Sequence, residues 1–296
     1  MRVLAAVLLC ACGSTSTIIT STGGGSGGSG GSGGAGGGVS SGGGAGGGLG
    51  DLCPEESKTV YVVAADRTFS AFDPRTKTFR DIGTLSCPAQ AGAGPFSMAI
   101  ARDAFAYVLY DDGELFKVST DTLACTKTAF QPDATYRVFG MGFSTDSPGA
   151  MTDTLFIAGG QSVTPASKLG RLDVATFAPM PGADLVGWPE LTGTGSAQLW
   201  GFFPIGTATP FVARIDKTSG AFSQTFMAPE LNGNASSWAF AFWGGSFWIF
   251  YQRDSDASTK VWEMKAATGA VTEAVANTGR TIVGAGVSTC APVTIN

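Results

Sequence analysis

One short polar turn occurs five times in this chain, each time directly after an apolar residue. The five apolar positions lie 46, 54, 43 and 49 residues apart. In a sequence rich in strand-forming residues, a repeat of this length is typical of the blades of a β-propeller. The five copies of the turn are Phe72-Asp73-Pro74-Arg75-Thr76, Val118-Ser119-Thr120-Asp121-Thr122, Leu172-Asp173-Val174-Ala175-Thr176, Ile215-Asp216-Lys217-Thr218-Ser219-Gly220 and Met264-Lys265-Ala266-Ala267-Thr268-Gly269.

Each repeat can be divided into four strands that are rich in aromatic and β-branched residues. We therefore expect an all-β fold of five four-stranded antiparallel blades, with six blades as the less favoured count. The innermost strands are expected at Phe96–Ala101, Val138–Phe143, Leu191–Gly195, Trp238–Phe242 and Ile282–Val287. Small residues stand at matching places in these strands, where the ring would be most crowded. They are Ala99, Gly142, Gly193, Ala241 and Gly286.

The strands at the two ends of the domain predict how the ring closes. The first strand, Val60–Ala64, is the second strand of a blade, whereas the last strand, Ile282–Val287, is an innermost one. The C-terminal strand is therefore expected to join the N-terminal blade, which would leave no open sheet edge.

Four cysteines lie in the propeller region, and two disulfides among them could be paired in three ways. Cys53 precedes the first strand and Cys290 follows the last. Because those strands would be antiparallel neighbours, we predict a Cys53–Cys290 bond, and Cys87–Cys125 follows by elimination. A four-cysteine zinc site is the alternative, but the chain has no Cys-x-x-Cys pair to support it.

The N-terminal segment has the features of an export signal. Arg2 is followed by the apolar stretch Val3–Leu9. The sequence Leu9-Cys10-Ala11-Cys12-Gly13 resembles the bacterial lipobox, which would make Cys12 the lipidated first residue of the mature protein. The apolar stretch is short for this role, and an ordinary cleaved signal, or no signal, is the alternative.

Residues 13–50 consist almost entirely of Gly, Ser, Thr and Ala. Such a segment is expected to be disordered because it has little side-chain surface to bury. A flexible chain of this length spans roughly 30–40 Å. We therefore divide the chain into a signal peptide (1–11), a lipidated Gly/Ser-rich tether (12–52) and a propeller domain (53–296). This division predicts export and lipid anchoring in the bacterial cell envelope, at the outer membrane, with the side of that membrane left open.

Composition argues against several classes of function. The net charge is −5 and charged residues make up 14% of the chain, which does not favour binding to nucleic acid. Histidine is absent, and with it the commonest general base and metal ligand. Asp111-Asp112-Gly113-Glu114 is better explained as a hairpin turn than as a calcium site. We expect no metal, no cofactor and a monomer.

Several aromatic and charged residues are expected to share one face of the ring, where the innermost strands begin. Aromatic rings combined with arginine and a carboxylate can bind a sugar or a peptide. The alternative is that the aromatic residues pack between blades, as most aromatic residues in such a fold do. The candidate residues are Phe96, Tyr136, Arg137, Trp188, Glu190, Trp238 and Arg280.

The propeller region resembles uncharacterised bacterial lipoproteins in which a Gly-rich tether precedes a β-propeller, and this resemblance implies no known activity. The segments that carry the resemblance are Leu52-Cys53-Pro54-Glu55, Gly83-Thr84-Leu85-Ser86-Cys87-Pro88, Phe139-Gly140-Met141-Gly142-Phe143, Glu190-Leu191-Thr192-Gly193-Thr194-Gly195, Trp238-Ala239-Phe240-Ala241-Phe242-Trp243-Gly244-Gly245 and Gly284-Ala285-Gly286-Val287-Ser288-Thr289-Cys290.

Three functional hypotheses remain. The first is an envelope lipoprotein that displays the propeller as a ligand-binding or protein-interaction module and is not an enzyme. The second is a carbohydrate-active hydrolase that uses Glu190, although glycoside hydrolysis needs a pair of carboxylates and the inner strands offer only this one. The third is a structural envelope protein that binds nothing at the channel.

Overall fold

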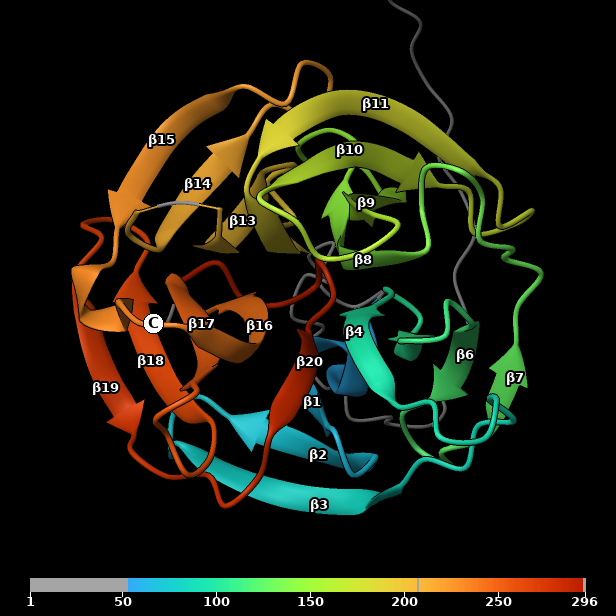
Figure 1. The fold of residues 1–296 in the computed structure, drawn as a ribbon, viewed down its shortest axis with the longest axis horizontal. Coiled ribbons are helices and arrows are strands. Elements are labelled where there is room, and N and C mark those ends of the chain that lie inside the picture. The colour runs from blue at the N-terminus through green and yellow to red at the C-terminus, as the bar shows by residue number, and fades with distance from the viewer. Residues whose placement is uncertain (1–52, 207, 295–296) are drawn as a thin grey trace, which may run out of the picture. The chain divides into compact units, whose positions relative to one another are not determined.

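The computed structural model describes residues 53–206 and 208–294. The segments predicted as signal peptide (1–11) and tether (12–52), with the predicted lipidation site Cys12, lie outside the described residues. Five four-stranded antiparallel sheets form a ring around a central axis (Figure 1). The expected fold class, a five-bladed β-propeller, is confirmed.

Each blade runs from an innermost strand at the axis to an outermost strand at the rim. In that order, the first blade consists of β20 (Ile282–Gly286), β1 (Val60–Ala64), β2 (Thr68–Asp73) and β3 (Thr78–Thr84). The second consists of β4 (Pro95–Ile100), β5 (Phe105–Tyr110), β6 (Leu115–Ser119) and β7 (Cys125–Lys127), and the third of β8 (Val138–Thr145), β9 (Asp153–Gly160), β10 (Ala166–Leu172) and β11 (Pro179–Val186). The fourth consists of β12 (Trp188–Gly193), β13 (Leu199–Ile205), β14 (Phe211–Ile215) and β15 (Phe222–Met227), and the fifth of β16 (Ala235–Trp243), β17 (Ser246–Arg253), β18 (Lys260–Lys265) and β19 (Val271–Val275).

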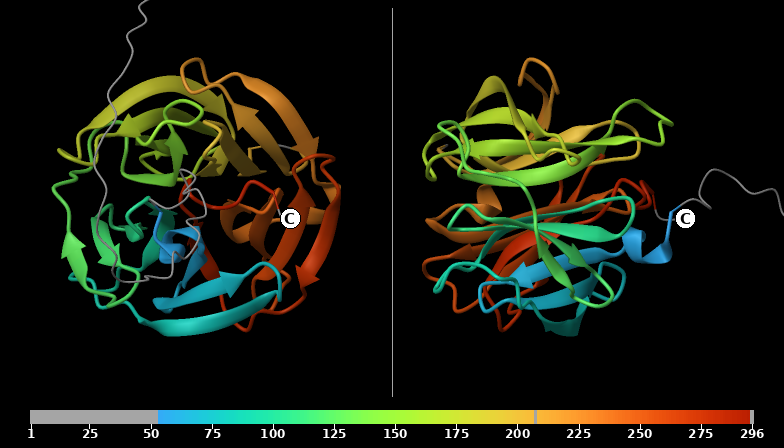
Figure 2. Two further views of the ribbon diagram at one scale, coloured as in Figure 1. Left: turned by 180° about the vertical axis from the view of Figure 1, so that it is seen from behind. Right: turned by 90° about the vertical axis from the view of Figure 1, so that its right-hand side faces the viewer.

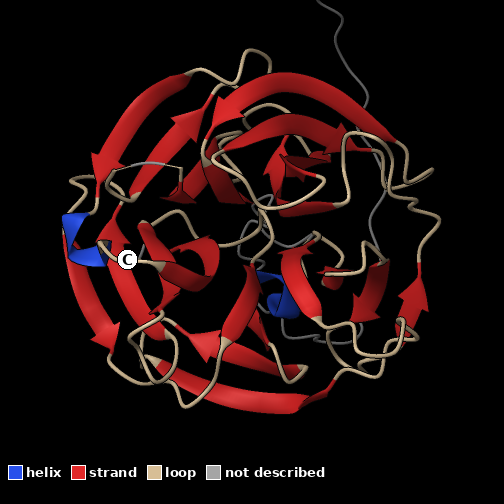
Figure 3. Ribbon diagram, viewed as in Figure 1, coloured by secondary structure: helices blue, strands red, loops and turns tan. Residues whose placement is uncertain are grey.

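Helix is limited in the described residues to two short 3-10 segments, η2 (Glu55–Lys58) and η3 (Pro229–Leu231) (Figure 3). In the same part of the chain, no helix has the length and apolar character needed to cross a membrane.

The ring closes in the way that the strand order predicts. The last strand, β20, pairs antiparallel with the first, β1, and Tyr61 lies opposite Gly286. Figures 1 and 2 show these two strands, from opposite ends of the domain, side by side in one blade. The first blade is therefore built from both ends of the domain.

Burial decreases from the axis outward. The strands β1, β8 and β12 are buried at every position, whereas the outer strand β15 is mostly exposed. Aromatic rings fill the space between neighbouring blades: the Phe72 ring of the first blade lies 5.3 Å from that of Trp248 in the fifth, between ring centroids. Such pairs make the contact between blades a continuous apolar core.

The small residues of the innermost strands are explained by the closeness of neighbouring backbones. A Cβ placed on Gly193 of β12 would lie 2.2 Å from the carbonyl oxygen of Phe143 in β8. One placed on Gly142 of β8 would lie 2.7 Å from the carbonyl oxygen of Leu191. Because these distances are shorter than any van der Waals contact, only glycine fits at either position.

The repeated turn has one backbone conformation in all five blades. The residue five positions after the apolar residue of each turn has a left-handed φ and donates its N–H to the carbonyl four residues earlier. These residues and their φ angles are Lys77 (59°), Leu123 (58°), Phe177 (59°), Gly220 (71°) and Gly269 (74°). In two blades this left-handed position is occupied by glycine, which adopts such a φ without steric strain. In the other three it is occupied by a residue with a side chain, which adopts this φ at some energetic cost.

Both predicted disulfides are present. Cys53 is bonded to Cys290 with 6.0 Å between the Cα atoms, and Cys87 is bonded to Cys125 with 5.1 Å. The first bond joins the segment before β1 to the segment after β20, and so links the two halves of the closing blade. The second joins the exit of the first blade to the outer strand of the second.

Candidate functional site

Four of the five innermost strands are irregular near the end where they begin. Strand pairing shifts between Pro95 and Ser97 in β4, between Trp188 and Glu190 in β12, between Ala235 and Ser237 in β16, and where β20 meets Val63 and Ala64 of β1. In three strands the residue left without a partner is Phe96, Ser236 or Val283. Such bulges redirect side chains and are frequent beside functional sites.

These irregularities surround a cavity of about 300 Å³ at the end of the ring where the innermost strands start. We call it the mouth cavity. Its wall is mostly apolar and contains two aromatic rings. The apolar wall includes Phe96, Val163, Ile205, Trp238 and Val283, and the polar lining residues are Glu190, Ser236 and Ser237. All three residues left unpaired by the bulges therefore line the cavity.

Glu190 is a buried carboxyl group in the cavity wall, with the residue only 3% exposed. Its Oε2 accepts a hydrogen bond of 2.9 Å from the Ser97 hydroxyl. Burial raises the pKa of Glu190 well above its ordinary value of 4.5, while the Ser97 hydroxyl and the backbone N–H groups of Met141 and Leu191 oppose the shift. The neutral carboxylic acid is therefore favoured to higher pH than in a solvated glutamate.

Ser237 supplies a polar atom that lacks a partner. The residue is 5% exposed, and its hydroxyl makes no hydrogen bond with the residues that the structure describes. Its neighbour Ser236 is exposed and donates its hydroxyl to the carbonyl of Gln252 at 3.1 Å. The hydroxyl oxygen of Ser237 is almost fully enclosed by protein atoms, so the hydroxyl is not presented to the cavity.

Three of the seven candidate residues meet at the mouth cavity, namely Phe96, Glu190 and Trp238. The other four lie elsewhere. Tyr136 and Trp188 are 0% and 1% exposed and belong to the apolar core between blades. For these two residues, the alternative of packing between blades therefore describes the structure better than ligand binding does.

The two arginines do not line the cavity either. Arg280 forms an ion pair with Asp81 at 2.7 Å, donates to the Ser70 hydroxyl at 2.8 Å and lies over the Phe79 ring. Arg137 is exposed, and its side chain lies close to Gly113 in the second blade. The guanidinium group expected to help hold a sugar or peptide is thus missing from the mouth cavity.

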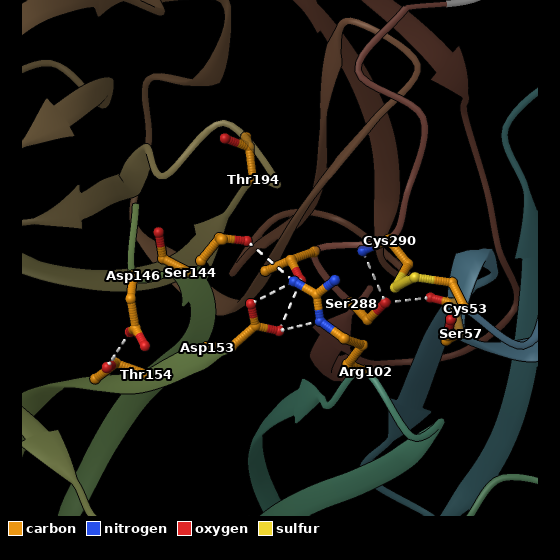
Figure 4. Close-up of polar contacts among 12 residues, drawn as sticks. Cys53, Ser57, Arg102, Ser144, Asp146, Asp153, Thr154, Thr194, Ser288 and Cys290 are labelled. Carbon is orange, nitrogen blue, oxygen red and sulfur yellow. Dashed lines mark hydrogen bonds and ion pairs between the residues drawn. A yellow bond between two sulfur atoms is a disulfide. The ribbon is translucent and has the colours of Figure 1, made fainter. Parts of the chain in front are cut away.

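A group of polar contacts around Arg102 lies at the other end of the ring, where the innermost strands finish (Figure 4). The guanidinium donates to both carboxylate oxygens of Asp153, at 2.7 and 3.3 Å. It also reaches the hydroxyls of Thr145 and Thr289, at 3.3 and 2.9 Å. Because Thr289 follows β20, these bonds tie the C-terminal segment to the second and third blades.

A further hydrogen bond attaches the C-terminal segment to the N-terminal part of the domain, beside the ring-closing disulfide. The Ser288 hydroxyl donates to the carbonyl oxygen of Ser57 at 2.8 Å, next to the Cys53–Cys290 bond (Figure 4). The N-terminal η2 and the segment after β20 therefore meet at the end of the channel that is opposite the mouth cavity.

The remaining candidate sites have simpler explanations. Asp112 accepts the backbone N–H groups of Gln90 and Glu114, as a turn requires. In the described part of the chain, no group of three or more Cys, Asp or Glu residues could hold a metal ion. Two larger surface grooves, of about 480 and 510 Å³, have no buried polar atom without a partner in their walls.

Comparison with solved structures finds matches of low sequence identity with TM-scores below 0.5. No family model and no curated protein sequence matches the chain. A chain of a nidogen/laminin complex is 12% identical with a TM-score of 0.45, and 80% of this chain covers 99% of that one. A Bacteroides caccae protein of unknown function is 11% identical with a TM-score of 0.46, and 77% of this chain covers 97% of it.

A chain of a mitotic checkpoint complex is 15% identical with a TM-score of 0.40, and 73% of this chain covers 60% of that one. The chain thus spans about three-fifths of this structure. The site of the present chain has to be understood from its own residues.

Proposed function

We propose that this propeller is a ligand-binding module and that the mouth cavity is its site. The observation that carries the proposal is the cavity itself, in which an apolar wall with the rings of Phe96 and Trp238 surrounds the buried carboxyl group of Glu190. Apolar walls with a few convergent polar groups are the usual composition of a ligand site, and a volume of about 300 Å³ suits a small molecule or one side chain.

The surroundings of the cavity support binding without rearrangement. The innermost strands are the most buried part of the blades, so the lining residues start from a rigid frame. A preformed site loses little conformational entropy when a ligand binds.

The hydrolase alternative has less support. Glu190 is the single carboxyl group among the described residues that line the cavity, whereas glycoside hydrolysis employs two. A cavity with one neutral acid and two serines fits recognition better than bond cleavage. The third alternative, a structural protein without a ligand, is one outcome of the ligand screen that tests the proposal.

We further propose that the module is displayed from the cell envelope, anchored through Cys12 and the tether 12–52. Two disulfides are in keeping with an exported protein, because such bonds persist in oxidising compartments. The ligand would then be met outside the cytoplasm.

The test is a screen of the full-length protein against glycan and peptide arrays, together with a cavity-filling variant. Ser236→Trp places an indole in the cavity from an exposed bulge position, so the core is left intact. Ser223→Trp makes the same change at an exposed site of the outer strand β15 and is the matched control. We expect ligands that bind the wild type and Ser223→Trp but are lost in Ser236→Trp. Equal binding by all three proteins, or none to the wild type, would overturn the proposal.

A further inference from the structure

The charged groups in the lining of the mouth cavity favour a cationic ligand over an anionic one. This inference rests on the proposed function of the cavity as a ligand site. Its lining contains one carboxyl group, Glu190, and two aromatic rings, Phe96 and Trp238. Among the described lining residues there is no lysine or arginine. An anionic ligand would therefore find no opposite charge, and a basic group could come only from the ligand.

Glu190 also lacks a counter-ion within the described part of the protein. The residues that face it from neighbouring strands are Ser97 of β4, Met141 of β8 and Phe202 of β13, and none of them is charged. The parts of β16 and β20 that line the cavity contribute only uncharged side chains. Its raised pKa has burial as the largest cause and no contribution from a charged neighbour. Ionising a buried carboxyl group that has no counter-ion is costly, so burial favours the protonated form of Glu190.

We propose that the mouth cavity binds an organic ammonium group, with Glu190 as its counter-ion and the rings of Phe96 and Trp238 against its apolar face. Aromatic rings attract ammonium groups through the negative face of the ring, and this attraction is strongest away from water.

Binding would release a proton. Where free Glu190 is protonated, an ammonium ligand converts the carboxylic acid to a carboxylate and one proton passes to solvent, while the ligand keeps its own charge. The affinity should then rise with pH, by up to about tenfold per unit, until the pH exceeds the pKa of Glu190 in the free protein. A neutral ligand would show no such dependence.

The experiment uses choline and its neutral isostere 3,3-dimethylbutan-1-ol as probes. Both are titrated into the full-length protein by calorimetry, at several pH values and in two buffers of different ionisation enthalpy. We expect choline to bind roughly tenfold more tightly than the isostere and to release protons. Glu190→Gln should weaken the preference for choline and abolish the proton release, because the amide keeps the shape without the charge while the aromatic rings remain.

A second set of probes separates free ammonium compounds from a partner protein. A short peptide that contains one trimethyllysine is compared with choline and with the same peptide carrying leucine at that position. Tighter binding of choline indicates a small molecule, and tighter binding of the trimethyllysine peptide indicates a protein partner; either result supports the ammonium proposal.

Two outcomes contradict the inference in distinguishable ways. If the isostere binds as tightly as choline and Ser236→Trp abolishes both, the cavity is a ligand site but the preference for an ammonium group is refuted. If the cationic probes do not bind, or bind equally well to Ser236→Trp, the ammonium site is refuted outright. The array screen then decides separately whether the cavity binds anything.

Discussion

The ring-closing disulfide should contribute more to stability than the second disulfide, and the sequence separations give the size of the difference. Cys53 and Cys290 are 237 residues apart, whereas Cys87 and Cys125 are 38 apart. In the chain-entropy model, these loops restrict the unfolded chain by about 18 and about 13 cal/mol/K. At 25 °C these values correspond to about 5.5 and about 3.9 kcal/mol of stability.

The perturbation is a pair of double variants, Cys53→Ala with Cys290→Ala and Cys87→Ala with Cys125→Ala. At about 2–4 °C per kcal/mol for a domain of this size, the first should lower the melting temperature by about 11–22 °C and the second by about 8–16 °C. Equilibrium unfolding in urea, combined with scanning calorimetry, measures both. Because each variant removes two cysteines, the comparison controls for the chemical change.

Hydrogen exchange locates the effect. Without the ring-closing bond, the amides of β20 and β1 should lose more protection than those of the other blades, because these strands complete the ring. Two results would refute the claim that the Cys53–Cys290 bond stabilises the blade formed by β20 and β1. One is a larger loss of stability in the Cys87/Cys125 variant, and the other is a uniform change in protection around the ring.

Three further predictions concern single residues. Glu190→Gln should remove a pH dependence of stability. Folding raises the pKa of Glu190, so the wild type loses stability as the pH rises from the unfolded pKa near 4.5 to the folded pKa. In urea unfolding, the stability of the variant relative to the wild type should therefore increase by up to about 1.4 kcal/mol per pH unit over this range, and a constant difference would contradict the raised pKa. Gly193→Ala should lower the free energy of unfolding, measured in urea, by about 1–3 kcal/mol or more, because the new methyl group would lie 2.2 Å from the carbonyl oxygen of Phe143. An unchanged free energy of unfolding would argue against such close packing of the two backbones. Lys77→Gly should stabilise by about 0.5–1 kcal/mol in the same assay, because Lys77 is exposed with a φ of 59°, and a loss of stability would exclude the left-handed turn.

The architecture could be predicted from sequence because its signals are local and repeated. The five turns recur with similar spacing, and the entry at Val60–Ala64 and exit at Ile282 follow from counting strands. The Cys53–Cys290 disulfide was predicted from this strand order, and Cys87–Cys125 by elimination. Glycines such as Gly193 marked the inner strands, because close backbone contact forbids a side chain there in any sequence.

The site was only partly predictable, because it depends on bulges. The start of the fourth inner strand was expected at Leu191, whereas β12 begins at Trp188. The bulges that turn Phe96, Ser236 and Val283 toward the cavity have no local signature, since an extra residue in a strand is defined by its partner strand. Ser237 was missed for this reason.

Burial of an aromatic residue also depends on its neighbours across blades. Trp188 and Trp238 occupy comparable places at the start of inner strands, yet Trp188 is 1% exposed in the core while Trp238 is partly exposed at the cavity. The residues around them in the sequence do not show which tryptophan is buried, because burial here depends on how adjacent blades pack.

The central claim is that a ligand occupies the mouth cavity, and the six tryptophans provide a direct measurement of it. Their indole N–H signals are observed by nuclear magnetic resonance of the ¹⁵N-labelled full-length protein, and that of Trp238 is assigned with Trp238→Phe. During titration with choline, or with a ligand from the array screen, the account predicts a saturable shift of the Trp238 signal and little change at the core residues Trp188 and Trp248. Saturable binding that leaves the Trp238 signal unmoved would contradict it.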